Sequence, residues 1–239
     1  MSSNILLVTA TFNTSLFSTP LTVLNDTRIR ISQDFNTLKF IILQTNVDII
    51  ILCENTGFKV DLEHIYRLAE ERKKKIIFIQ FEGNISAINK YGKGFGEGEI
   101  IKYAIENSIF LQSNEQSFYK LTGRIYIENI NKILKNTHNE ICFVRPSLLA
   151  KKQADTRFFK CNVGFYKKKL INAYLHVDDK DNFFLEKAFF NSLMNEKISN
   201  FCEYPKYIGQ SGSTGEKYDL TLFKYNLYKI YNKLGMLNL

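Results

Sequence analysis

Residues 47–53 read VDIIILC, a run that is apolar except for one aspartate. A short and almost unbroken apolar run is typical of a strand that is buried on both faces of a sheet. Residues 4–10 (NILLVTA) and 75–81 (KIIFIQF) have the same character. Between the three runs, residues 30–45 place apolar side chains at helical spacing, and Asp61 can cap a second helix. This alternation predicts an α/β fold with a parallel sheet covered by helices on both faces.

The rest of the chain continues this pattern less regularly. A glycine-rich loop leads into a predicted helix at residues 97–108, and residues 118–121 are typical of a fourth strand. The elements predicted in the second half are short strands at 141–145 and 157–163, a helix at 183–194, a glycine–serine loop at 209–215 and a closing helix at 219–234. Because no repeat or linker divides the chain, we expect one domain over residues 1–239.

Composition and charge narrow the class of protein. With 239 residues, 45% of them hydrophobic, the chain can bury the core of one globular domain. No stretch reaches 18 consecutive apolar residues, the first residues lack the features of a signal peptide, and the four cysteines form no CxxC pair. We therefore expect a cytoplasmic protein with free thiols. The net charge of +8 favours a nucleic acid, a phosphorylated small molecule or an anionic membrane surface as partner.

Small polar residues follow the predicted strands, at the sheet edge where open parallel sheets bind ligands. The candidates from three of these loops are Thr9, Thr11, Asn13, Glu54, Asn55, Thr122, Gly123 and Arg124. Such side chains suit a nucleotide, although Asn, Thr and Gly are also ordinary turn formers.

Seven of the twelve glycines lie in two clusters: Gly92, Gly94, Gly96 and Gly98, and then Gly209, Gly212 and Gly215. Alternate glycines let backbone N–H groups approach an anion, and a helix start at Glu97 adds a positive dipole end. The first cluster therefore indicates either a phosphate-binding loop or a flexible lid. Its spacing matches neither GxGxxG nor GxxxxGK[S/T], which argues against a dinucleotide dehydrogenase and a P-loop NTPase.

Carboxylates gather in residues 177–186, VDDKDNFFLE. Asp178, Asp179 and Asp181 precede a predicted helix and can cap it. Asp179 and Asp181 also form a DxD pair, the type that holds Mg²⁺ or Mn²⁺ against a diphosphate. Glu186 lies beside bulky apolar residues, where burial would raise its pKa toward that of a general base.

Six segments in order carry a resemblance to a known family. They are ILCENTG (51–57), KGFGEGEIIKYAIENS (93–108), FYKLTGRIYIENINKI (118–133), DTRFF (155–159), VDDKDNFFLEKAFF (177–190) and IGQSGSTGEKY (208–218). The set resembles small bacterial glycosyltransferases encoded among capsule, O-antigen and lipooligosaccharide genes, and it covers nearly the whole chain. The resemblance implies a GT-A-like fold, with a parallel, Rossmann-like nucleotide-sugar-binding half at about 1–124 and a smaller mixed α+β acceptor-binding half at about 125–239.

The activity that the resemblance implies is transfer of a sugar, with a hexosyl group expected, from a nucleotide sugar to a growing surface glycan. The expected donor is a UDP-sugar, and the expected acceptor is lipid-linked or an oligosaccharide. We expect Glu186 to be the catalytic base, with Asp179 as second choice, and Asp155 and Arg157 to hold the acceptor. The expected donor-binding residues are Thr9, Thr11, Asn13, Glu54, Asn55, Lys93, Gly94, Gly96, Glu97, Lys120, Thr122, Gly123, Arg124, Ser211, Gly212 and Ser213.

The family pattern places a DxD at the end of the fourth strand, where this chain has residues 120–124, KLTGR. We therefore expect that no metal cofactor is required, because Lys120 and Arg124 can neutralise a departing diphosphate as fixed positive charge. The alternatives are that both side chains pair with carboxylates of the sheet edge, and that Mg²⁺ or Mn²⁺ binds at Asp179 and Asp181.

A half-sheet of this kind also occurs in sugar nucleotidyltransferases, and a basic net charge also occurs in nucleic-acid-binding proteins, so both functions are alternatives. A sugar nucleotidyltransferase normally has a glycine-rich basic signature after its first strand, but residues 9–18 (TATFNTSLFS) contain no Gly, Lys or Arg. A nucleic-acid-binding protein needs a basic stripe with interleaved aromatic residues, whereas the lysine runs at 73–75, 151–152 and 167–169 are typical of solvated helix ends and loops. We expect no nucleic acid partner.

The closing helix carries an apolar stripe beside tyrosines and lysines. The stripe is Leu220, Phe223, Leu227, Ile230 and Leu234, with Tyr225, Tyr228 and Tyr231 beside it and Lys224, Lys229 and Lys233 on the remaining surface. One interpretation is that the stripe packs on the sheet and completes the core. The other is that the helix makes a peripheral contact with an anionic inner membrane.

Overall fold

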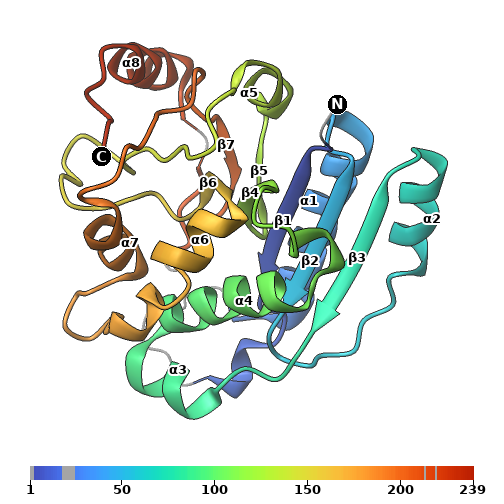
Figure 1. Ribbon diagram of the computed structural model, residues 1–239. Helices are drawn as coiled ribbons and strands as arrows, with labels where there is room; N and C mark the ends of the chain where they lie inside the picture. Colours follow the sequence, from blue (N-terminus) through green and yellow to red (C-terminus); the bar gives the residue numbers. More distant parts are fainter. Residues whose placement is uncertain (1–2, 18–24, 213, 219) are drawn as a thin grey trace.

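The computed structural model describes residues 3–17, 25–212, 214–218 and 220–239. Its centre is a five-stranded sheet with the strand order β3-β2-β1-β4-β6, and a two-stranded sheet of β5 and β7 accompanies it (Figure 1). Strands β1 to β4 run parallel, and β6 is antiparallel to β4. The strands are β1 (Ile5–Ala10), β2 (Ile49–Glu54), β3 (Lys75–Gln80), β4 (Ser117–Thr122), β5 (Ile125–Ile127), β6 (Phe158–Asn162) and β7 (Tyr207–Gly209).

Helices cover the sheet, and in the second half of the chain they alternate with loops (Figure 1). They are α1 (Thr27–Gln44), α2 (Glu63–Glu71), α3 (Ile85–Tyr91), α4 (Lys93–Asn107), α5 (Ile130–Asn136), α6 (Val163–Lys169), α7 (Leu185–Leu193) and α8 (Leu222–Lys233). Three short 3-10 turns lie at η1 (Thr14–Leu16), η2 (Ile109–Leu111) and η3 (Ala173–His176).

The core lies on both faces of the sheet, because successive side chains of a strand point to opposite faces. Leu7 and Ile51 belong to an apolar cluster that includes the buried residues of α4 and α7. Leu6 and Val8, the neighbours of Leu7, belong to a second cluster that includes the buried residues of α1 and α2. The predicted parallel sheet with helices on both faces is therefore confirmed.

The first glycine cluster forms a helix and not the predicted loop. Helix α4 begins at Lys93, so Gly94, Gly96 and Gly98 lie inside it. A Cβ atom at Gly98 would lie 2.1 Å from Tyr174 Cβ, a distance that real Cβ atoms do not reach. Glycine at this position therefore allows close packing of α4 against η3, and the predicted glycine-rich loop is wrong.

Two further predictions differ from the structure. Residues 141–145 form no strand, because only Cys142 in this segment makes isolated bridges, to Lys160 and Ser199. Helix α1 begins at Thr27, earlier than predicted, because the Asp26 carboxylate caps it by accepting the Ile29 N–H at 3.0 Å.

Helix α8 leaves most of its apolar stripe in solvent, although Leu220 and Leu227 are half-buried. Phe223, Ile230 and Leu234 are 77%, 52% and 69% exposed. The helix docks instead through tyrosines, because the Tyr228 ring stacks on Tyr204 with ring centres 5.1 Å apart. The prediction that the stripe completes the core is therefore wrong, and the predicted start of this helix at residue 219 lies outside the described residues.

A separate finding concerns membrane-spanning segments. Within the described ranges, every helix is too short or too polar to cross a bilayer.

Candidate functional site

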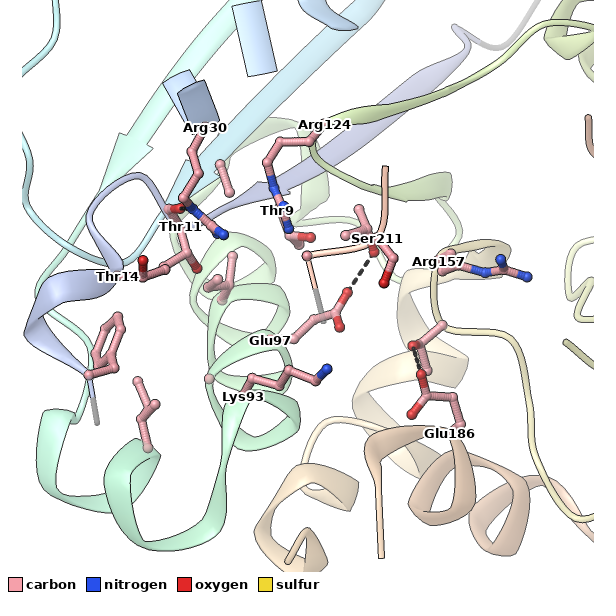
Figure 2. Close-up of a pocket in the computed structure, with 18 of the residues that line it drawn as sticks. Thr9, Thr11, Thr14, Arg30, Lys93, Glu97, Arg124, Arg157, Glu186 and Ser211 are labelled. Carbon is pink, nitrogen blue, oxygen red and sulfur yellow. Dashed lines mark hydrogen bonds between the residues drawn. The ribbon is translucent and has the colours of Figure 1, made fainter. Parts of the chain in front are cut away.

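A cavity of about 220 Å³ opens at the carboxyl ends of β1 and β4, between α1, α4 and the loop after β7 (Figure 2). This is the edge at which open parallel sheets bind ligands. Eleven of the expected site residues line the cavity: Thr9, Thr11, Lys93, Gly96, Glu97, Thr122, Arg124, Arg157, Glu186, Ser211 and Gly212. The structure thus brings together predicted residues from the ends of β1 and β4, from α4 and α7, and from the loop after β7, whereas Glu54 and Asn55 after β2 do not line the cavity.

Other lining residues were not predicted from the sequence. They are Ala10, Thr14, Phe17, Arg30, Ile88, Ile100, Thr156 and Tyr218. Arg30 matters most because it adds a cation to the cavity from α1. One feature of the sequence could have identified Arg30 as a buried charge. Arg30 and Asp34 lie one helical turn apart and in phase with Leu38 and Ile41, on the face that α1 buries.

Two guanidinium groups reach the cavity from the same side (Figure 2). Arg30 is only 4% exposed, and its Nε donates a hydrogen bond to the carbonyl oxygen of Thr11 at 2.8 Å. Burial and the nearby Arg124 lower the pKa of Arg30 to about 9, so the Arg30 side chain remains cationic at neutral pH. Their mutual repulsion makes this wall of the cavity a favourable place for an anion.

Lys93 and Glu186 lie on the opposite side of the cavity (Figure 2). Burial lowers the pKa of Lys93, although the carboxylates around it, first that of Asp179, oppose the decrease. Burial raises the pKa of Glu186, and the charge of Glu97 adds to the increase. The Thr156 hydroxyl donates a hydrogen bond to Glu186 Oε1 at 3.2 Å and so fixes its carboxylate. A carboxylate with a raised pKa is a better proton acceptor than an ordinary glutamate.

Lys120 does not reach the cavity, contrary to the prediction that it neutralises a leaving group. The side chain is fully buried and forms an ion pair with Glu97. Its ammonium also donates hydrogen bonds to Thr122 Oγ1 and to the Thr156 carbonyl oxygen, both at 2.7 Å. An ammonium has three N–H donors, and these three partners use all of them. The alternative interpretation, pairing with a carboxylate at the sheet edge, is therefore the correct one for Lys120.

The predicted residues after β1 and β2 mostly support the loops that form the cavity wall. Glu54 is fully buried, and its Oε1 accepts the backbone N–H groups of Phe12 and Thr56 at 3.0 and 2.9 Å. Asn55 Oδ1 accepts the Thr11 hydroxyl at 2.8 Å. Asn13 caps η1 by accepting the Ser15 N–H. These three side chains contact protein groups rather than the cavity.

Asp155 is a partner of Arg157 and does not face the cavity as an acceptor-binding group. Arg157 makes a two-pronged ion pair with Asp155, at 2.9 Å from Nε and 2.6 Å from Nη2. The Tyr207 hydroxyl donates to the same carboxylate, and the Tyr207 and Tyr218 rings lie on the guanidinium of Arg157 at 4.2 and 5.0 Å. Arg157 points away from Arg124 in Figure 2. The cluster therefore fastens the loop after β7 to the start of β6.

Asp179 and Asp181, the two carboxylates of the alternative metal site, have different surroundings. Asp179 is buried against the start of α4, where its Oδ2 accepts the Gly94 N–H at 3.3 Å, whereas Asp181 is exposed. Throughout the described ranges, no three His, Cys, Asp or Glu side chains lie close enough together to hold a metal ion. Asp179 stabilises a helix N-terminus, which favours a negative charge. Ser213 lies outside the described residues, and Gly123 lies behind the cavity wall against Asp34.

Comparisons with known proteins support the fold class. No protein-family model and no curated protein matches the chain. The structure is similar to the glycosyltransferase GlyE of Streptococcus pneumoniae TIGR4, with a TM-score of 0.51 and 11% identity over 83% of this chain and 46% of that one. It is also similar to the galactosyltransferase LgtC, solved with donor and acceptor sugar analogs, with a TM-score of 0.44 and 11% identity over 81% and 72% of the two chains. The chain thus spans about half of GlyE, and the predicted GT-A-like α/β fold is confirmed.

Proposed function

We propose that this protein is a glycosyltransferase that moves a hexosyl group from a UDP-sugar to an acceptor of a bacterial surface glycan. The observation that carries the proposal is the charge of the cavity at the carboxyl edge of the sheet. Arg30 and Arg124 line one side of it and Lys93 the other, whereas Glu97 is paired with Lys120 and Arg157 with Asp155. The diphosphate of a nucleotide sugar carries one negative charge on each phosphate, so its charge complements that of the cavity. The six segments that resemble surface-glycan glycosyltransferases support a lipid-linked or oligosaccharide acceptor.

In the proposed reaction, the acceptor hydroxyl oxygen bonds to the anomeric carbon while the bond from that carbon to the diphosphate oxygen breaks. The diphosphate leaves with the electron pair, and Glu186 takes the proton of the hydroxyl. Attack on the face opposite the diphosphate inverts the configuration at the anomeric carbon. The raised pKa of Glu186 suits a general base, and Lys93 beside it offsets charge on the departing group. Glu186→Gln should lower turnover by on the order of 10²- to 10⁴-fold and leave UDP affinity unchanged.

Binding of nucleotides tests the proposal directly. Thermal unfolding should be followed with UDP, GDP, CDP, CMP and NAD, each with Mn²⁺ and with EDTA. UDP at 100 times its dissociation constant should stabilise the fold by about 2.7 kcal/mol, and NAD should not stabilise it. The variant Arg67→Ala is a matched control, because Arg67 is an exposed arginine that pairs with Glu63 on α2, far from the cavity lining. If no pyrimidine or guanine nucleotide changes the unfolding temperature, the proposed donor site does not exist.

We also propose that α8 contacts the anionic membrane surface at which a lipid-linked acceptor would be presented. The helix contains three lysines and no acidic residue, and it exposes Leu222 and Phe223 at 73% and 77%. Apolar side chains with tyrosines and lysines beside them suit the interface of an anionic bilayer. Each lysine near such a surface contributes about 1 kcal/mol, so the contact is reversible and weakens with salt.

A further inference from the structure

The end of β4 does not offer ligands to a divalent cation, although GT-A-like enzymes normally place a metal-binding DxD there. The Thr122 hydroxyl is engaged by Glu97 at 2.8 Å and by Lys120 at 2.7 Å. Gly123 has no side chain, and Arg124 is a cation. Divalent cations such as Mg²⁺ and Mn²⁺ take oxygen ligands, mainly carboxylates, so the residues at this position do not fit a metal ion.

The backbone of this turn directs Arg124 into the cavity. Arg124 has a φ of 65°, a conformation unusual for a residue with a side chain. The preceding Gly123 donates its N–H to the Thr9 carbonyl oxygen at 2.8 Å, and a Cβ at Gly123 would lie 2.2 Å from Asp34 Oδ1. The turn is thus fixed by β1 on one side and by α1 on the other.

The guanidinium of Arg124 has donor capacity that the protein does not use. Its Nη1 is buried and has no hydrogen-bond acceptor among the described residues. The backbone of Gly212 covers it so closely that a Cβ there would lie 2.6 Å from Nη2. A buried N–H group without an acceptor is unfavourable, and an anionic ligand in the cavity would supply one.

Asp34 provides the charge that allows two arginines to lie together. It is 1% exposed and sits one helical turn from Arg30, and the backbone N–H of Arg124 is directed at its carboxyl group. Arg30, Arg124 and Glu54 are the charged groups that act on it. Burial raises the pKa of Asp34 to about 7 even though both arginines oppose the increase. Near neutral pH its negative charge is therefore incomplete, which leaves the arginines able to attract an anion.

We propose that Arg30 and Arg124 bind the diphosphate of the nucleotide-sugar donor directly, in the place that a divalent metal ion occupies in related folds. This inference rests on the proposed function. When the bond between the anomeric carbon and the diphosphate oxygen breaks, the negative charge on that oxygen is stabilised by guanidinium N–H groups. Planar guanidinium groups bind phosphate oxygens in pairs, which a lysine at position 124 would not reproduce.

The test is calorimetric titration of UDP and of inorganic pyrophosphate in EDTA and in Mn²⁺. We expect UDP to bind equally well in both conditions. The variant Arg124→Gly removes the guanidinium and also relieves the positive φ, so weaker binding cannot result from backbone strain. It should weaken UDP binding by about 10- to 100-fold, Arg124→Lys should restore only part of the loss, and Arg67→Ala should change nothing.

The outcomes separate this inference from the proposed function. UDP binding that needs Mn²⁺, or that survives Arg124→Gly unchanged, overturns the two-arginine site and leaves the glycosyltransferase proposal standing. Pyrophosphate binding that depends on Arg124, without binding of UDP, GDP or CDP, supports the anion site and overturns the nucleotide-sugar proposal. If neither pyrophosphate nor any nucleotide binds, both are overturned.

Discussion

Replacement of Lys120 by methionine separates a structural role of this residue from a catalytic one. Methionine keeps an unbranched side chain in the buried space but removes the ammonium and its three hydrogen bonds. Glu97 then loses its counter-charge, and the Thr156 carbonyl oxygen loses a donor. We expect Lys120→Met to destabilise the fold and to change ligand binding much less than Arg124→Gly does.

The size of the effect follows from the exposure of the two partners. Removal of one member of a buried ion pair typically reduces stability by about 3–5 kcal/mol. The Lys120 side chain is 0% exposed, but that of Glu97 is 25% exposed and keeps its hydrogen bond from Thr122. Water and this hydroxyl reduce the penalty for the remaining carboxylate, so we expect the lower end of the range, about 3 kcal/mol. Single domains are stable by about 5–15 kcal/mol, so the variant should still fold.

Urea unfolding followed by circular dichroism measures the change. The double variant Lys120→Met with Glu97→Gln should recover part of the loss, because no uncompensated carboxylate remains in it. A change of less than about 1 kcal/mol in the free energy of unfolding of Lys120→Met, together with loss of UDP binding, would contradict a structural role for Lys120. That result would return Lys120 to the role in leaving-group stabilisation that the sequence predicts.

Three further predictions concern packing, pH and membrane contact. Gly98→Ala places a Cβ against Tyr174 and should reduce stability by about 1–3 kcal/mol, and an unchanged melting temperature would contradict the close packing of α4. Because the folded-state pKa of Asp34 is about 7 against 3.8 in the unfolded chain, the native protein holds a proton that the unfolded chain releases, and stability falls as pH rises through this window. Asp34→Asn should therefore lose less stability than the wild type between pH 5 and pH 8 in urea titrations, and equal losses would refute this. The three lysines of α8 are Lys224, Lys229 and Lys233. When all three are replaced by glutamine, sedimentation with anionic liposomes at low salt should show weaker binding of the protein. Equal binding of this variant and the wild type would exclude α8 as the membrane contact.

The sequence predicts the strands of the parallel sheet well, because a strand that is buried on both faces consists of a short continuous run of apolar residues. Residues 47–53 and 75–81 differ from β2 and β3 by only a few terminal residues. The first glycine cluster is misread because its cause is tertiary: Gly98 packs on Tyr174, which is distant in sequence. Local spacing cannot distinguish glycines that approach a phosphate from glycines that approach another helix.

The same limit explains why the sequence selects Lys120 and misses Arg30. Lys120 stands next to a strand end in a segment that resembles a glycosyltransferase motif, and nothing in its neighbourhood reveals that Glu97 satisfies it. Arg30 belongs to a helix whose apolar residues alone account for its buried face in the sequence pattern, so nothing local marks Arg30 as a ligand-binding residue. Whether a charged residue serves the fold or a ligand depends on its partners, and those come from other elements of the chain.

Two buried charge clusters at the end of β4 illustrate this difference in physical terms. Around Lys120, each ammonium donor has an acceptor, so the cluster is complete without a ligand. Around Arg124, by contrast, the buried Nη1 has no hydrogen-bond acceptor in the part of the chain that the structure describes. Buried polar atoms without partners are rare because they are unfavourable, and those that persist need a cause. An anion bound between Arg30 and Arg124 would supply the missing acceptor and relieve the repulsion between the two guanidinium groups. We therefore expect a diphosphate to bind at the Arg124 cluster and not at the Lys120 cluster.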